Sequence, residues 1–462
     1  MNPLVQKRIT AAVLAFFCYL SSCFAADVSF PDRLVLLGLL ENRQLSELRE
    51  LINGYQQAYE SGSDSESKMV FVLETLANSE PTYVDIINDW VTSSPGDYIP
   101  HLVRAWSYYD LAWSWRGHRL REDTSSDRLE KMQAYLSLAA DDLSKAIELK
   151  PRLPAADALA IKLLMLLDGR QYMRSTLEES LQLNPDSVQV RSSYLWTLKP
   201  EWGGKAETLV AYVNEVKKAA ETYPQLQPLL GYSDYIFAAA LARKKEYEQA
   251  AEHFDFAVQH GADHLVYRDR GINYYRLRKF ELALENLDES LRLWPQASET
   301  LRWRSFTYQQ LGRKDEALAD LDLAVRLTPM NRYVLLAYAR LSRKMRRYEQ
   351  VLGNYERALY YNSDDAAIWF EKGMHNSHEL LNFRAAELEF KKATELAPGE
   401  ADYWYEYAAV LHYNVDCKIL TPLAKYLELC RSGSACRPAE LKWVEDASNW
   451  LEESGRCSAG YQ

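Results

Sequence analysis

Two histidines and a glutamate lie close together in the sequence and are residue types that bind metal ions: His375, His378 and Glu379. Side chains three residues apart share one face of a helix, so the two imidazoles could reach one ion. The order His-Glu-x-x-His, which sets two ligands and a general base on one helix face, does not occur, and we expect Glu379 to point elsewhere. The sequence therefore predicts no metal site and no cofactor.

A dense aromatic stretch, WSYYDLAWSW, runs from Trp106 to Trp115. Indole and phenol rings can stack on the apolar faces of sugars. On a helix, however, these rings cover more of the circumference than one groove would use. We therefore expect them to pack in a protein core.

Catalytic motifs with a defined spacing are missing from the sequence. We find no GxSxG, P-loop or GxGxxG pattern and no arrangement typical of a nucleophilic cysteine. Acidic pairs are common, but their positions suit solvated helix surfaces. The sequence predicts that the protein is not an enzyme. A helical glycan-processing enzyme is the least favoured alternative, because it needs two carboxylates about 5–10 Å apart across one cleft.

The composition indicates a large helical protein. The 462 residues are 48% hydrophobic and 26% charged, with only 18 glycines and 16 prolines but 31 tyrosines and 12 tryptophans. Few turn residues and many aromatic residues favour long packed helices over strands. The net charge of −11 argues against nucleic acid as a partner of the whole chain.

The N-terminus reads as a secretory signal peptide over residues 1–25. Lys7 and Arg8 precede the apolar run at residues 11–20, which is too short to span a bilayer. Cleavage after Ala25 would remove the leader. Alternatively, the segment ending at Cys23 resembles a bacterial lipobox, in which Cys23 is lipidated. We expect an exported protein, periplasmic or envelope-associated, that contacts the membrane only through such a lipid anchor.

The remaining four cysteines cluster near the C-terminus: Cys417, Cys430, Cys436 and Cys457. In an oxidising compartment, an even and clustered set predicts disulfides. Residues 420–429 and 438–451 should form an antiparallel helical hairpin, which favours the nested pairs 430–436 and 417–457. Four thiolates on zinc are the alternative, but no Cys-x-x-Cys pair is present. We expect a disulfide-stapled helical cap over residues 414–462.

The strongest signal is an internal repeat with a period of about 34 residues. Most units carry small residues at positions 8, 20 and 27, a large residue at 24 and proline at 32; one unit has Val351 at position 20 and Ser363 at position 32. One unit has Gly271, Tyr274, Ala283, Leu287, Ser290 and Pro295. The next has Ser305, Tyr308, Ala317, Leu321, Ala324 and Pro329. A later unit contains one extra residue near Asn382.

This pattern resembles the tetratricopeptide-repeat family over residues 231–413. Small residues let paired helices approach closely, and proline ends the second helix of each pair. The resemblance implies an all-α fold, a right-handed α-solenoid of antiparallel helix pairs. We place the array at residues 206–413.

The region before the array, residues 27–205, should also be helical, with degenerate repeat-like pairs. An aromatic segment ending in Trp-Arg-Gly, followed by helices and then by Pro200-Glu-Trp-Gly-Gly204, resembles an uncharacterised bacterial domain that precedes such arrays. The resemblance covers roughly residues 30–205 and brings no known activity with it.

In the tetratricopeptide family, five positions of the first helix of each pair line a concave groove. Here these positions and their aromatic neighbours provide Arg243, Arg268, Tyr275, Arg276, Arg302, Phe306, Arg340, Arg343 and Lys344. The acidic residues at the same positions are Glu299 and Asp402. We therefore expect a basic, aromatic groove that binds carboxylates.

Taken together, the sequence predicts an exported scaffold that binds a partner protein or an acidic peptide in this groove. The alternative is an envelope or polysaccharide-assembly factor that binds an anionic glycan.

Overall fold

The computed structural model describes residues 30–62, 66–117, 124–151, 153–348, 351–413, 417–432 and 436–454. These residues form helices joined by short turns, and no strand occurs among them. The predicted all-α solenoid is confirmed. No helix in these ranges is long and apolar enough to cross a membrane.

Within the described residues, ten α-helices precede the regular array. They are α2 (Arg33–Glu41), α3 (Leu45–Glu60), α4 (Glu66–Leu76), α5 (Pro81–Ser93), α6 (Tyr98–Arg116), α7 (Ser126–Leu149), α8 (Pro154–Leu166), α9 (Met173–Leu183), α10 (Val188–Thr197) and α11 (Ala206–Ala220). Short 3-10 turns flank α9–α11: η1 (Arg170–Tyr172), η2 (Pro200–Trp202) and η3 (Pro224–Leu229).

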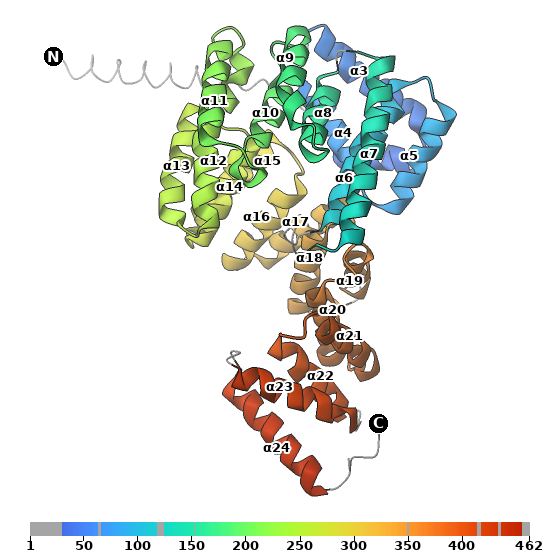
Figure 1. Ribbon diagram of the computed structural model, residues 1–462, viewed down its shortest axis with the longest axis vertical. Coiled ribbons are helices and arrows are strands. Elements are labelled where there is room, and N and C mark those ends of the chain that lie inside the picture. Colours follow the sequence, from blue (N-terminus) through green and yellow to red (C-terminus); the bar gives the residue numbers. More distant parts are fainter. Residues whose placement is uncertain are drawn as a thin grey trace, which may run out of the picture.

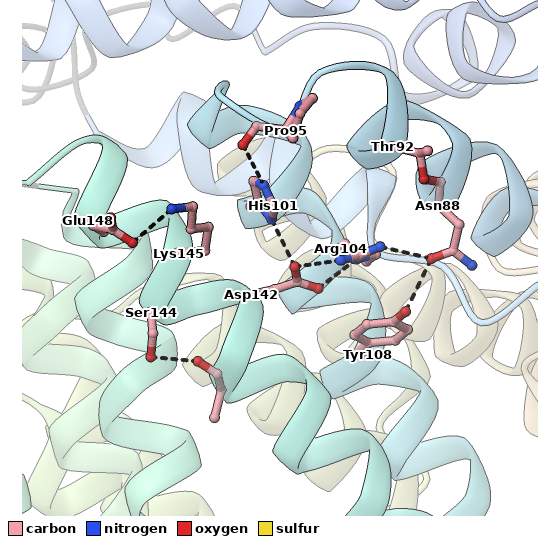
Figure 2. A network of polar contacts seen from close by, with 11 residues as sticks. Asn88, Thr92, Pro95, His101, Arg104, Tyr108, Asp142, Ser144, Lys145 and Glu148 are labelled. Carbon is pink, nitrogen blue, oxygen red and sulfur yellow. Dashed lines mark hydrogen bonds and ion pairs between the residues drawn. The ribbon is translucent and has the colours of Figure 1, made fainter.

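A buried carboxylate ties α6 to α7 (Figure 2). Asp142 accepts hydrogen bonds from His101 at 2.9 Å and from the Arg104 guanidinium at 2.6 and 2.8 Å. Arg104 and Tyr108 also donate to Asn88 of α5. A buried charge is stable only when it is paired and hydrogen-bonded, so this network fixes the register of three helices.

Antiparallel helix pairs then follow in regular order. They are α12 (Tyr232–Arg243) with α13 (Tyr247–His260), α14 (His264–Arg276) with α15 (Phe280–Leu293), α16 (Ser298–Gln310) with α17 (Lys314–Leu327), α18 (Arg332–Lys344) with α19 (Val351–Tyr360), and α20 (Ala366–Met374) with α21 (Phe383–Leu396). Three of the first helices, α14, α18 and α20, begin at side-chain caps, Asp263, Asn331 and Asp365, whose oxygens accept backbone N–H groups.

The repeat register read from the sequence is confirmed by burial. Positions 20, 24 and 27 of five consecutive pairs are at most 1% exposed: Ala250, Phe254, Ala257, Ala283, Leu287, Ser290, Ala317, Leu321, Ala324, Val351, Tyr355, Ala358, Ala386, Phe390 and Ala393. A methyl group added at Gly271 would lie 2.8 Å from Leu287, and one at Gly373 would lie 2.7 Å from Phe390. Position 8 is therefore small because the second helix packs directly against it.

The extra residue of the fifth pair is accommodated by a π-helix, η4 (His375–Glu379), between α20 and α21. A π-helix widens the turn by one residue, so the small residues on either side keep their register. Each turn between paired helices also has one residue with positive φ, namely Lys245, Arg278, Gly312, Arg346 and Leu381.

The N-terminal helices pack against later turns of the array. The Tyr361 hydroxyl donates to the Ser79 carbonyl oxygen at 2.6 Å, and Arg128 donates to the Tyr361 carbonyl oxygen at 2.7 Å. Two pairs earlier, Trp294 contacts the Phe71 ring at 5.2 Å. In Figure 1 the solenoid accordingly folds back beside its own N-terminal region.

The C-terminal helices continue away from this contact (Figure 1). They are α22 (Ala401–Tyr413), α23 (Leu420–Arg431) and α24 (Pro438–Ser454), with a 3-10 turn η5 (Cys417–Ile419) before α23. The predicted Cys430–Cys436 disulfide is present between α23 and α24. Cys417 is also bonded in a disulfide. Its predicted partner Cys457 lies outside the described residues, as do Cys23 and the rest of the leader.

Candidate functional site

The centre of the predicted groove is an arginine among aromatic rings. The Arg302 guanidinium lies 5.0 Å from the Trp303 ring, 5.2 Å from Phe306 and 5.7 Å from Tyr333. The Arg276 guanidinium also lies 5.2 Å from the Trp303 ring. Such cation–π contacts hold the cations over a flat surface. Three of the predicted residues, Arg276, Arg302 and Phe306, thus meet here.

Tyr275 joins the same cluster from α14. Its ring packs edge-on against Trp303 at 5.6 Å and against Phe280 at 5.7 Å. Trp303 therefore connects the predicted residues of α14 to those of α16, although the sequence reasoning did not select it. Its position directly after Arg302 in the repeat could have identified Trp303 from the sequence.

Acidic partners neutralise most of the predicted groove arginines. Arg302 forms two hydrogen bonds with Glu299, and Arg340 forms a bidentate pair with Glu371. Further pairs join Arg243 to Glu201 at 2.7 Å, Arg268 to Asp269 at 2.7 Å and Arg343 to Glu379 at 3.2 Å. The groove is thus mixed in charge, because four of these acids lie outside the helix positions that the sequence reasoning considered.

One side of α18 is exposed to solvent. Tyr333 is 46% exposed, the Arg340 side chain is 53% exposed, and Lys344 is also exposed. Positions 333, 340 and 344 lie on one side of a helix with 3.6 residues per turn. We call these three residues the α18 face.

Residues just before the array contact the first of the predicted groove positions. Lys199 lies 5.1 Å from the Tyr235 ring, and the Tyr235 hydroxyl donates to Asp269 at 2.8 Å. Burial raises the pKa of Asp269, but the Arg268 guanidinium lowers it. The pKa of Asp269 is therefore below its ordinary value.

The candidate metal residues are placed differently from the expectation. The π-helix turns Glu379 toward His375, and their nearest nitrogen and oxygen lie 3.5 Å apart, so the expectation that Glu379 points elsewhere is wrong. His375 is fully buried, and both of its ring nitrogens lack a hydrogen-bond partner. Burial, with the nearby Arg343 charge, lowers the pKa of His375. Among the described residues, no group of three His, Cys, Asp or Glu side chains is arranged to hold a metal ion.

The aromatic stretch of α6 is only partly a core. Trp106 is 4% exposed and belongs to the main N-terminal core. Trp113 and Trp115 retain exposed surface, and Trp113 contacts the Trp202 ring at 5.8 Å. The expectation of core packing thus holds for the start of the stretch and not for its end.

A family model matches the N-terminal region. Residues 32–177 match the domain of unknown function DUF4034. This confirms the resemblance seen in the sequence and covers α2–α8 and the start of α9. The matched region includes Phe71, Ser79 and Arg128, three of the residues that contact the array.

Among proteins of known structure, those similar to this chain include tetratricopeptide-repeat proteins. The structure of YrrB, described as a TPR protein with an unusual peptide-binding site, is 22% identical, with a TM-score of 0.36 over 43% of this chain and 99% of that one. The C-terminal part of a TPR repeat-containing protein from Cytophaga hutchinsonii is 17% identical, with a TM-score of 0.41 over 48% and 89%.

MamA from Desulfovibrio magneticus RS-1 is 21% identical, with a TM-score of 0.34 over 37% of this chain and 97% of that one. No curated protein matches the sequence.

Proposed function

We propose that the protein is a scaffold whose α18 face and neighbouring arginine–aromatic cluster bind an acidic segment of a partner protein. The observation that carries this proposal is the exposure of Tyr333, Arg340 and Lys344 on one side of α18. An exposed tyrosine flanked by cations is typical of residues that dominate the energy of protein interfaces.

The internal ion pairs are compatible with carboxylate binding. A guanidinium has five N–H donors, and a bidentate carboxylate uses two of them. Arg340 is half exposed while paired with Glu371, so its remaining donors are accessible to a second carboxylate. Lys344 adds a positive charge one helical turn away. The expected ligand is therefore a peptide with few carboxylates beside an apolar residue, rather than a long polyanion.

We also propose that the protein works outside the cytoplasm. The signal-peptide pattern at residues 1–25 and the clustered C-terminal cysteines support export. The disulfide between Cys430 and Cys436 suits an oxidising compartment. Whether Cys23 carries a lipid is decided by mass spectrometry of the mature N-terminus.

The test is a cross-linked pull-down from envelope extract with a matched pair of variants. Arg340→Glu with Lys344→Glu reverses two charges on the α18 face. Lys314→Glu with Arg326→Glu changes the net charge equally at exposed positions of α17. We expect the α18 variant to lose the captured partner and the α17 variant to retain it. Equal capture by both variants, each with wild-type helical content, would contradict the proposal.

A further inference from the structure

Pairs of adjacent cations occur at the turns inside the helix pairs of the array. In the third turn such a pair is balanced by the two acidic residues that follow it, at 315–316. In the first, second and fourth turns an excess of positive charge remains. The cations of these three turns are exposed, and we call them the basic edge: Lys244, Lys245, Arg278, Lys279, Arg346 and Arg347.

The turns of the basic edge lie along one side of the array because the helix pairs stack in order. The first helices of neighbouring pairs contact one another from α12 to α18. Arg347 of the fourth turn reaches Asp315 of the third turn at 3.9 Å, so these two turns are adjacent. Neighbouring helices pack up to about 10 Å apart, and the edge therefore extends over about 30 Å.

The N-terminal region packs against the other ends of these helices, at the loops between pairs. The Arg33 N–H donates to the Gln296 side chain at 2.9 Å, and the Tyr361 hydroxyl donates to the Ser79 carbonyl oxygen at 2.6 Å. A helix of 13 residues separates its two ends by about 20 Å. The basic edge is thus on the side of the array that these contacts leave exposed.

Five of the six cations form no ion pair within the described chain, and Arg347 has only the exposed contact with Asp315. A single carboxylate follows each pair within two residues in the sequence, namely Glu246, Glu281 or Glu349. Each of the three turns therefore keeps a net positive charge on a protein whose net charge is −11. These charges are available to an external anionic surface.

Local stability does not explain why these positions are basic. One cation at the end of a first helix interacts favourably with its dipole, but a second one extends toward the next helix. Lys279 is the N-cap of α15, where positive charge is unfavourable and its side chain makes no capping bond. Lys245, Arg278 and Arg346 have φ of 67°, 59° and 57°, a conformation that favours glycine. A binding role accounts for cations at such positions.

Exposed leucines continue the edge at the fifth turn. Leu380 is 41% exposed and Leu381 is 67% exposed. Their turn adjoins the fourth one, because Glu379 pairs with Arg343 at 3.2 Å. A dissolved polyanion gains little from exposed leucines. A bilayer surface, in contrast, takes cations at its anionic headgroups and aliphatic side chains just below them.

We propose that the basic edge, together with Leu380 and Leu381, binds the surface of a bilayer that contains anionic phospholipids. This contact is additional to any lipid at Cys23. It shares no residue with the α18 face and does not rest on the proposed peptide binding.

The test is co-sedimentation of the exported chain with lipid vesicles, with Cys23→Ser so that no lipid is attached. The vesicles consist of phosphatidylcholine with or without phosphatidylglycerol. We expect binding only where phosphatidylglycerol is present, weakening as salt is added. Arg278→Glu with Lys279→Glu should lower the partition coefficient about thirtyfold or more, since each basic residue at an anionic surface contributes about fivefold.

Lys217→Glu with Lys218→Glu is the matched control, because it reverses two adjacent exposed charges on α11 and should bind like the wild type. The variant at 278–279 should keep the wild-type unfolding temperature, since neither residue forms an ion pair among the described residues and a carboxylate suits the N-cap of α15. Equal loss of binding in both double variants would contradict a specific role of the edge.

Leu380→Gln with Leu381→Asn separates a bilayer from a soluble polyanion. This variant should bind vesicles several-fold more weakly and should bind heparin as the wild type does. Wild-type protein that fails to sediment with phosphatidylglycerol vesicles, or that sediments equally with pure phosphatidylcholine, would overturn the proposal. Vesicle binding that is unaffected by the two leucine substitutions would also overturn it, in favour of a polyanionic partner.

Discussion

The Tyr361 hydroxyl donates a hydrogen bond to the carbonyl oxygen of Ser79, 2.6 Å away and 282 residues earlier in the chain. Tyr361 is 5% exposed and packs against Trp115 at 5.2 Å. Arg128 completes the contact by bonding the Tyr361 carbonyl and pairing with Asp364 at 3.0 Å. A solenoid usually contacts only its neighbouring repeats. Here the DUF4034 domain bridges repeats that are far apart in sequence.

We predict that Tyr361→Phe loosens this bridge. Loss of one buried hydrogen bond should cost about 1 kcal/mol and leave the Ser79 carbonyl without this donor. Hydrogen exchange should accelerate around residues 77–80 and in α20. The neighbouring Tyr360→Phe is the control, because Tyr360 is 56% exposed. Equal exchange in both variants would show that the bridge does not depend on this bond.

The repeat array was predictable because its packing involves residues that are close together in the sequence. Small residues such as Ala283 and Ala317 recur where two helices approach closely, and that periodicity is visible in the sequence alone. The sequence also shows the extra residue near Asn382, but it does not show which backbone conformation accommodates that residue. A π-helix at His375–Glu379 instead of a longer loop depends on the packing of Phe390 against Gly373.

The charge of the groove was not predictable from helix positions. Glu371 and Glu379 belong to the next helix pair and reach Arg340 and Arg343 only after the repeats stack. Glu201 reaches Arg243 from a turn outside the array. The contact between Tyr361 and Ser79 likewise follows from the curvature of the whole solenoid, which no local pattern encodes.

We predict that Leu381→Gly stabilises the fifth helix pair. Leu381 has φ of 54°, a left-handed conformation that costs a residue with a side chain about 1 kcal/mol. It is also 67% exposed, so little burial is lost. Leu388→Gly is a matched control, since Leu388 is equally exposed but lies inside α21. Glycine there should destabilise by about 1 kcal/mol. Urea unfolding that shows both variants destabilised alike would refute the assignment of strain.

We predict that Glu66 makes stability fall with rising pH. Burial raises its pKa from 4.5 to about 7 in the folded protein, although backbone N–H groups of α10 partly oppose this. The pKa of Glu66 is higher in the folded protein than in the unfolded chain. Its contribution to the stability of the fold is therefore complete below pH 4.5 and is lost as pH rises through 7. The effect is about 3 kcal/mol at most.

Glu66→Gln should remove this dependence, since the amide keeps an acceptor for the Gln189 N–H and cannot ionise. Thermal unfolding between pH 4.5 and 8 measures the difference from wild type. A variant whose stability follows the wild-type pH profile would contradict the role of Glu66.

We predict that the Cys430–Cys436 disulfide stabilises the C-terminal helices locally. Closing so short a loop should contribute about 2 kcal/mol by chain entropy. Cys430→Ser with Cys436→Ser should therefore speed hydrogen exchange in α23 and α24 and leave α12–α17 unchanged. Faster exchange throughout the array would mean that the cap controls the entire solenoid instead.

The most direct test of the proposed function places a photo-cross-linking amino acid at Tyr333 in living cells. The same amino acid at Leu388, exposed on α21, is the control. The scaffold proposal predicts a discrete partner protein cross-linked from position 333 and not from 388, and its loss when Arg340→Glu and Lys344→Glu are added. No adduct at position 333, or the same adducts from both positions, would contradict it.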